Sequence, residues 1–178
     1  MRKWPLAFVA ICALLVSACG FRPLYGQLGA NPGAQRIFAS IYVEPIDLER
    51  VGYELRNSLI DLLEASSTPR GAIYHLAVSV KEKREGAVLQ NQLVGGVNET
   101  TIARYNYTLI AQYKLTDAKG ATVTSGSAST LSAYNVVTSP YATQVAQQDA
   151  RKRASDDIAQ RIRLDLGVYF AQRQPGAK

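Results

Sequence analysis

The sequence has few of the residues on which catalytic and metal sites depend. Its 178 residues include two cysteines and one histidine, His75. Any Ser–His or Cys–His arrangement would have to use His75, which we expect in the middle of a β-strand, opposite the strand's apolar side. No Cys/His cluster has the spacing of a metal site. The sequence therefore predicts a non-enzymatic protein that holds no metal ion.

Motifs for phosphate and nucleotide cofactors are missing too. The chain contains neither a P-loop nor GxGxxG, and Gly95-Gly96 is a turn signal only. The adjacent acids Asp156 and Asp157 would point to different sides of a helix and cannot act as a carboxylate pair. The formal net charge of +6 is mild and does not indicate a nucleic-acid partner. We therefore expect no bound cofactor and no nucleic acid.

The sequence also lacks an apolar run long enough to cross a bilayer. The uncharged stretch from Trp4 to Ala18 has 15 residues, whereas a spanning helix needs about 20. Arg2 and Lys3 precede it, and a basic start followed by a short apolar run is typical of an export signal. We predict that residues 1–18 are a signal peptide that is removed.

Cysteine is so scarce that the mature chain would keep one, Cys19, because Cys12 lies in the expected signal. An exported chain with one cysteine forms no internal disulfide. The segment Val16-Ser17-Ala18-Cys19 resembles the bacterial lipobox, in which the thiol receives a diacylglyceryl group and the new amine an acyl chain. Several acyl chains anchor a protein stably. The residue after Cys19 is not Asp, which favours the outer membrane. The alternative is a buried thiol beside a coincidental cleavage site.

The mature chain divides into three parts. Residues 19–35 are rich in Gly, Pro and Asn and are expected to be a lipidated N-terminus and flexible tether. Residues 36–172 form the folded domain, and 173–178 a disordered tail. The domain begins with alternating Ile37, Ala39, Ile41 and Val43, which predicts a strand that ends at Pro45.

A helix is predicted next, with Asp47 as a plausible N-cap. Its apolar residues recur at helical spacing, and they are Leu48, Val51, Leu55, Leu59, Leu62 and Leu63. Gly52 lies inside this helix and weakens the expectation for its first turn. A second helix is predicted after Pro140, because apolar residues recur every four positions and are small in its first half. These are Ala146, Ala150, Ala154, Ile158, Ile162, Leu166 and Phe170.

The middle of the chain predicts three strands. A two-residue turn at Gly95-Gly96 would place Val80 opposite Ala111, Val78 opposite Tyr113 and Leu76 opposite Leu115, with both apolar faces on one side. A longer loop across 86–101 is the alternative. A three-residue loop over 118–120 would place Leu115 opposite Val123 and Tyr107 opposite Leu131. The last strand is rich in Ser, Thr and Ala, which predicts an edge or a partner contact.

The order β-α-β-β-β-α predicts an α+β two-layer sandwich, with two helices on one face of a four-stranded, mainly antiparallel sheet. In the register above, Lys81, Lys83 and Lys114 share the polar face, and Arg84 and Arg104 lie toward the hairpin tip. Such cations could meet a ligand that carries several phosphates. The alternative is a charged edge that prevents sheets from aggregating.

Four features together resemble the lipopolysaccharide-assembly lipoprotein family LptE. They are the lipobox followed by "CGFRPLYG", the element order, the segment "ARYNYTLIAQYKLTD" and the long C-terminal helix. The resemblance implies a non-enzymatic, periplasm-facing lipoprotein anchored in the outer membrane. It would sit in the lumen of the LptD β-barrel, aid its assembly, act as a plug and contact lipopolysaccharide.

Candidate contacts to the lipid A phosphates rest on their charge alone, and they are Lys81, Lys83, Arg84 and Arg104. A rival interpretation is an auxiliary lipoprotein of an envelope phospholipid-trafficking system, which would need a lipid-sized apolar cavity.

Overall fold

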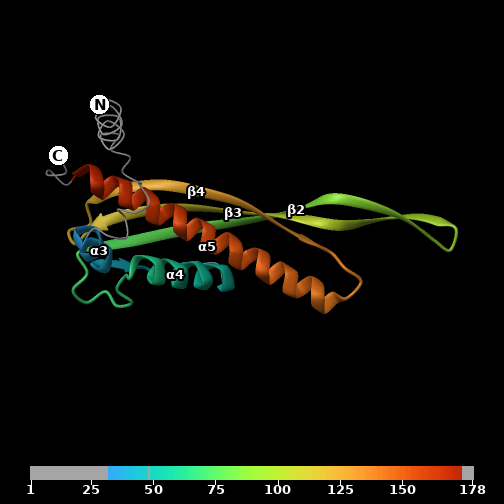
Figure 1. Ribbon diagram of the computed structural model, residues 1–178, viewed down its shortest axis with the longest axis horizontal. Coiled ribbons are helices and arrows are strands. Elements are labelled where there is room, and N and C mark those ends of the chain that lie inside the picture. The colour runs from blue at the N-terminus through green and yellow to red at the C-terminus, as the bar shows by residue number, and fades with distance from the viewer. Residues whose placement is uncertain (1–31, 48, 174–178) are drawn as a thin grey trace, which may run out of the picture. The chain divides into compact units, whose positions relative to one another are not determined.

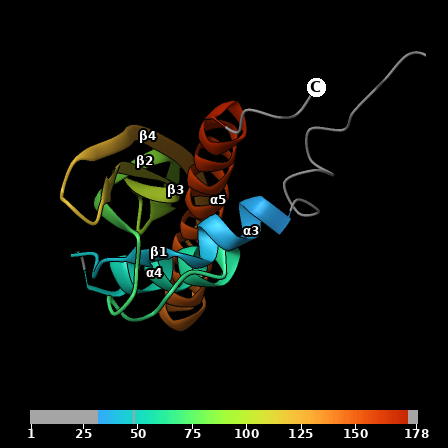
Figure 2. The same cartoon turned by 90° about the vertical axis from the view of Figure 1, so that its left-hand side faces the viewer.

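The computed structural model describes residues 32–47 and 49–173. Its elements are α3 (Pro32–Ala39), β1 (Ile41–Val43), α4 (Glu49–Leu63), β2 (Tyr74–Val94), β3 (Val97–Asp117), β4 (Thr122–Asn135) and α5 (Pro140–Arg173). The strands form one sheet in the order β1-β2-β3-β4, in which β1 is parallel to β2 and the other pairs are antiparallel. Helices α4 and α5 pack on one face of this sheet (Figures 1 and 2). The predicted α+β sandwich is confirmed.

The predicted first strand is wrong over its first half. Residues 36–39 belong to α3, and only Ile41–Val43 form β1. Phe38, rather than Ile37 or Ala39, is the buried residue of this segment, so the alternation there was not that of a strand. Proline suits the first turn of a helix. The helix ends at Ala39. The hydroxyl and the amide of the next residue, Ser40, both donate to the carbonyl of Ile37, at 2.6 and 3.0 Å.

Helix α4 presents the predicted apolar residues to the core. Val51, Leu55, Leu59 and Leu63 are buried. Gly52, which seemed unfavourable for a helix, has a packing role. A Cβ atom there would collide with the carbonyl oxygen of Ile46 and lie 2.9 Å from that of Asp47. The missing side chain lets the first turn of α4 pack against the chain that leads into it.

The register of β2 and β3 is the predicted one. Val80 pairs with Ala111, Val78 with Tyr113 and Leu76 with Leu115. The turn residues Gly95 and Gly96 have φ angles of 59° and 86°, which a two-residue hairpin turn of this kind requires. The strands stay paired from Val94 and Val97 inward, past a bulge between Gly86 and Leu89, so the alternative of a long loop is excluded.

The register of β3 and β4 differs from the prediction by one residue. Thr116 pairs with Thr122 and Gly120 has a φ of 82°, as the expected loop requires. A bulge then shifts the pairing, so that Leu115 lies opposite Thr124 and Tyr107 opposite Ser132. The hydroxyl of Tyr169 on α5 donates to the carbonyl of Val123 at this bulge, at 2.8 Å.

The shifted register places small residues of β4 under the helices. Gly126 faces Tyr113, and a Cβ atom on Gly126 would lie 2.7 Å from the Cζ atom of Tyr113. Ala128 is buried, whereas Leu131 is 63% exposed. The Tyr113 ring therefore covers Gly126 on its way to Asp165 of α5, to which its hydroxyl donates at 3.1 Å.

Helix α5 completes the core. The predicted positions from Ala150 to Phe170 are buried, and Ala146 is half-buried. They pack over fully buried leucines of the sheet, among them Leu76, Leu109 and Leu115. The small residues in the first half of this helix include Ala150 and Ala154, each 1% exposed.

Candidate ligand-binding surfaces

The sheet has two faces with different surroundings. One face packs against α4 and α5, and we call it the helix-side face. No described helix covers the other, which we call the outer face (Figure 2). Side chains alternate between the faces along each strand. The outer face carries the residues Ala77, Ser79, Lys81, Lys83, Arg104, Gln112, Lys114, Ser125 and Ser127.

The structure divides the four predicted lipopolysaccharide contacts between these faces. Lys81, Lys83 and Arg104 lie on the outer face with Lys114. Arg84 lies on the helix-side face, where its guanidinium is 5.1 Å from the centre of the Tyr105 ring. The four cations therefore cannot meet one compact phosphate group together.

Three of these outer-face cations have no acidic partner among the described residues. Lys83 pairs with Glu85, Nζ to Oε1 at 2.8 Å, and both side chains are largely exposed. The ion pairs of the described chain include none for Lys81, Arg104 or Lys114. A positively charged surface thus runs along β2 and β3 and remains available to an anion.

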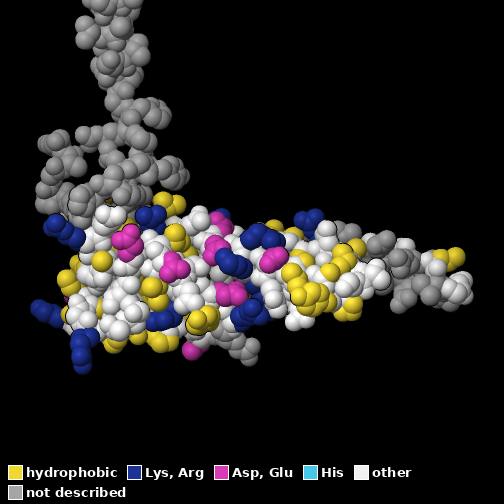
Figure 3. Space-filling model, turned by 60° about the horizontal axis from the view of Figure 1, so that its bottom comes forward, with side chains coloured by type: hydrophobic (Ala, Val, Ile, Leu, Met, Phe, Trp, Pro, Cys, Tyr) yellow, Lys and Arg dark blue, Asp and Glu magenta, His cyan; other side chains and the backbone are white. Residues whose placement is uncertain are grey.

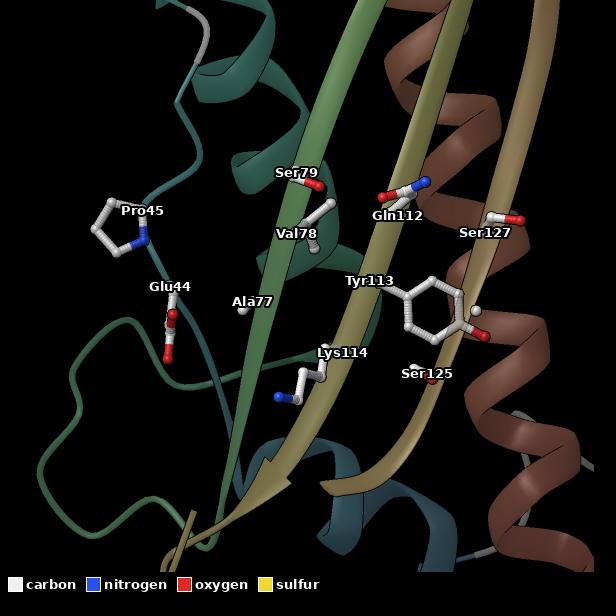
Figure 4. A pocket seen from close by; sticks show the side chains of 11 residues that line it. Glu44, Pro45, Ala77, Val78, Ser79, Gln112, Tyr113, Lys114, Ser125 and Ser127 are labelled. Atoms are coloured by element: carbon white, nitrogen blue, oxygen red, sulfur yellow. The ribbon is translucent and has the colours of Figure 1, made fainter. Parts of the chain in front are cut away.

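A hollow of about 590 Å³ opens on the outer face beside this surface (Figure 4). It is lined by β2, β3, β4 and the segment that follows β1, and the small side chains of Ala77, Ser125 and Ser127 leave the space. Lys114 and Glu44 are the charged residues in its lining. The hollow is open to the surface, and its lining mixes polar and apolar groups.

A second hollow of about 370 Å³ lies beside α3 and the end of α5. Its lining is more apolar, and consists of Ile37, Tyr74, Val123, Tyr169 and Phe170 with Asp117 and Arg173. Like the first, it is open to the surface. Neither hollow is a closed, lipid-sized apolar cavity of the kind that the phospholipid-trafficking interpretation would need.

On the helix-side face, Glu82 joins β2 to α5. It accepts hydrogen bonds from the Tyr107 hydroxyl at 2.9 Å and from Arg151 at 3.2 Å. Burial, followed by the neighbouring Glu82 carboxylate, raises the pKa of Tyr107 well above its ordinary value. The sequence did not predict the group of Glu82, Tyr107 and Arg151, because Arg151 is 69 positions from Glu82 in the chain. A signal was available, since Glu82 falls in the alternation of Leu76, Val78 and Val80.

The neighbours of His75 in the described part of the chain include Tyr42 and Glu44. Its ring lies edge-on to that of Tyr42, with centres 5.7 Å apart, and its Nδ1 atom is 3.9 Å from Glu44. Asp156 accepts from Ser58 of α4 at 2.7 Å, and Asp157 bonds Thr130 of β4, so these acids point to different sides, as predicted. Within the described ranges, no three His, Cys, Asp or Glu residues gather as a metal site.

Charges of both signs occur along the described residues of α5. Figure 3 shows basic and acidic side chains interspersed over the side of the molecule that bears the helices. Lys152 pairs with Asp156 and Arg161 with Asp157 along α5, at 2.9 and 3.1 Å. Exposed pairs of this kind are typical of a solvated helix face and contribute little to stability.

Several predictions concern residues outside the described part of the chain. They are the signal peptide at 1–18, the lipid anchor at Cys19, most of the tether at 19–35 and the tail beyond Arg173. Of the helices that are described, none combines the length and the apolar character needed to cross a membrane.

The fold is a helix-backed sheet whose open face carries cations and a hollow. The family model described as "LptE: Lipopolysaccharide-assembly" matches residues 38–166. The chain belongs to this family of lipopolysaccharide-assembly lipoproteins, which is not enzymatic.

Solved structures agree with this assignment. The chain is similar to a putative lipoprotein from Caulobacter crescentus CB15, with 31% identity, a TM-score of 0.64, and coverage of 79% of this chain and 98% of that one. Rare lipoprotein B from Shewanella oneidensis shares the fold at 10% identity, with a TM-score of 0.51 and coverage of 74% and 96%. Uncharacterized lipoprotein B from Nitrosomonas europaea does so at 11% identity and a TM-score of 0.51, covering 74% and 83%. A search of curated proteins gave no match.

Proposed function

We propose that this protein is an outer-membrane lipoprotein that binds and plugs an LptD-like β-barrel. It aids the assembly of that barrel and the insertion of lipopolysaccharide into the outer leaflet. The observation that carries the proposal is the family match over 38–166. The lipobox supports the anchor, with diacylglyceryl and N-acyl groups on Cys19 holding the domain on the periplasmic side.

Lipopolysaccharide would meet the protein at the outer face. Lys81, Lys83 and Arg104 lie on the same face of one hairpin, and Lys and Arg both bind phosphate groups through charge-assisted hydrogen bonds. Arg84 would reach the ligand only from the opposite side of the hairpin. The hollow around Lys114 would receive sugar or phosphate groups of the same ligand.

Affinity purification from detergent-solubilised outer membrane tests the barrel partner. The full chain carries a C-terminal tag, and an unrelated tagged lipoprotein is the control. We expect a β-barrel protein to be recovered with this chain and not with the control. Depletion of the chain should lower surface lipopolysaccharide and leave the barrel misassembled. Recovery of no barrel, or equal recovery with the control, would contradict the proposal.

A further inference from the structure

A smaller hollow, of about 270 Å³, lies on the helix-side face between the central hairpin and the first half of α5. Strand β2 contributes Glu82 and Arg84 to its lining, β3 contributes Tyr107, and α5 contributes Gln147 and Arg151. All five side chains carry polar groups, and two of them are guanidinium groups. The hollow thus has the chemistry of an anion site, on the face of the sheet opposite the outer-face cations.

The guanidinium of Arg84 is positioned by an aromatic ring. It lies 5.1 Å from the centre of the Tyr105 ring. Tyr105 is itself stacked on Tyr134 of β4, with ring centres 5.5 Å apart. Stacking uses the flat face of a guanidinium and leaves the N–H groups at its rim free to donate. In the described part of the chain, none of the ion pairs includes Arg84, so no carboxylate neutralises it.

Arg151 approaches the same hollow from α5. Its Nη2 atom donates to Oε1 of Glu82 at 3.2 Å, and its guanidinium carbon lies 6.0 Å from the centre of the Tyr107 ring. Its Nε atom is buried and has no hydrogen-bond partner among the described residues. An unpaired buried donor is uncommon in proteins and indicates a partner that the chain does not supply, such as an ion. Arg151 is therefore held in place with part of its donor capacity unused.

The acid in the lining does not close the hollow to anions. Glu82 accepts from Arg151 through Oε1 and from the Tyr107 hydroxyl through Oε2, the latter at 2.9 Å, so both of its oxygens are already hydrogen-bonded. Two guanidinium groups and one carboxylate leave the lining with a formal charge of 2 − 1 = +1. The half-buried amide of Gln147 adds a neutral donor. The lining therefore attracts an anion and can donate several hydrogen bonds to it.

We propose that this hollow binds a phosphate group. Its donors come from two elements, Arg84 of β2 on one wall and Gln147 and Arg151 of α5 on the other. A phosphate has oxygens that point in several directions and can accept from donors on opposite walls, whereas one guanidinium satisfies a carboxylate along a single edge. The inference does not rest on the proposed lipopolysaccharide contact, which lies on the outer face.

Titration with inorganic phosphate tests the site. Calorimetry measures binding to the full-length lipoprotein in a non-ionic detergent, for the wild type, Arg84→Gln and Lys83→Gln. The two variants lose the same charge at adjacent positions of β2, but Lys83 lies on the outer face. Arg84→Gln should raise the dissociation constant for phosphate about tenfold, as expected for the loss of a hydrogen bond from a charged group, and Lys83→Gln should leave it nearly unchanged. Equal effects of the two variants, or no phosphate binding to the wild type, would overturn the proposal.

A second pair of variants tests the wall that α5 provides. Gln147→Glu adds a carboxylate to the lining, whereas Gln144→Glu adds one at an exposed position about one turn earlier in the same helix. We expect Gln147→Glu to abolish phosphate binding and Gln144→Glu to retain it, with the circular dichroism of both unchanged. Retained binding in Gln147→Glu would show that α5 does not line the site, and the proposal would fail.

Two further titrations separate the chemistry of the ligand from its source. Acetate should bind the wild type about tenfold more weakly than phosphate, because it can reach donors on one wall only. Equal affinity for acetate would make this a carboxylate site and overturn the assignment. Micelles that contain phosphatidylglycerol displace the phosphate if a lipid headgroup is the source, and do not displace it if the source is a soluble phosphate. Either of these two results supports a phosphate site.

Discussion

Gly52 illustrates how one residue can be misjudged from the sequence. In the interior of an exposed helix, alanine is favoured over glycine by about 1 kcal/mol. At position 52 the order is reversed, because the space for a Cβ atom is occupied by backbone oxygens of Ile46 and Asp47 that cannot rotate away. The glycine is thus a packing requirement where α4 begins.

Gly52→Ala should therefore destabilise the protein, although alanine is the better helix former. We expect a loss of about 1–3 kcal/mol in the free energy of unfolding, the usual cost of overpacking. Urea denaturation measures it. Gln160→Ala, at an exposed position of α5, is the control and should be neutral or slightly stabilising. A gain in the free energy of unfolding of Gly52→Ala would contradict this prediction, because it would show that the backbone at Ile46 and Asp47 moves to make room for the added methyl group.

The outer-face lysines are the second feature at this scale. If they bind phosphates, Lys81→Glu with Lys83→Glu should weaken lipopolysaccharide binding about tenfold or more at low salt. The difference should shrink in high salt, which screens exposed charges. Arg70→Glu with Lys119→Glu changes the same net charge at exposed loop positions and is the control. Unchanged binding in the first variant would assign these lysines to protection of the edge of β2.

At the scale of elements, α5 is held to the sheet by polar links, of which the two tyrosine bonds are part-buried, as well as by apolar packing. Tyr113 of β3 reaches Asp165, and Tyr107 reaches Glu82, which Arg151 of α5 also bonds. Burial, and then the charge of Asp165, raises the pKa of Tyr113 from 10.0 to about 12. The folded state therefore favours the neutral phenol.

This shift predicts how stability changes in alkali. The contribution of Tyr113 is fully present below pH 10, the ordinary pKa, and is lost as the pH rises through about 12. Tyr113→Phe should make the fall in the free energy of unfolding between pH 10 and 12 shallower, as followed by chemical denaturation. Tyr53→Phe, at a side chain 66% exposed, should leave the fall as it is. If the free energy of unfolding fell equally steeply between pH 10 and 12 in the wild type and both variants, the raised pKa of Tyr113 would be refuted.

The elements also show where pattern reasoning succeeds. The β2–β3 register follows from the alternation of Leu76, Val78 and Val80 and from a glycine pair that fits one type of turn. The predicted β3–β4 register was wrong by one residue. A bulge at Val123 adds a residue to β4, and no local sequence pattern indicates this bulge. That bulge is held by Tyr169, which is 46 positions away.

At the scale of the whole molecule, the proposed function depends on the anchor at Cys19. Mass spectrometry of the purified mature protein should find an N-terminus at Cys19 that carries diacylglyceryl and N-acyl groups. Cys19→Ala should abolish this modification and release the protein from the membrane fraction. A mature N-terminus elsewhere, or an unmodified thiol at position 19, would remove the basis for the proposed location.

The sequence by itself determined the two-layer class, the order of the four strands and the two long helices, and the apolar stripes of both helices, because these depend on local spacing. The family was indicated by resemblance to known sequences. The sequence also identified the cations of the central hairpin. Only the tertiary structure decided that Arg84 lies on the opposite face from Lys81, Lys83 and Arg104. It alone gave the links from Glu82 to Arg151 and from Tyr113 to Asp165. The physical reason is that these features join residues far apart in the chain, through register and close packing that no local pattern records.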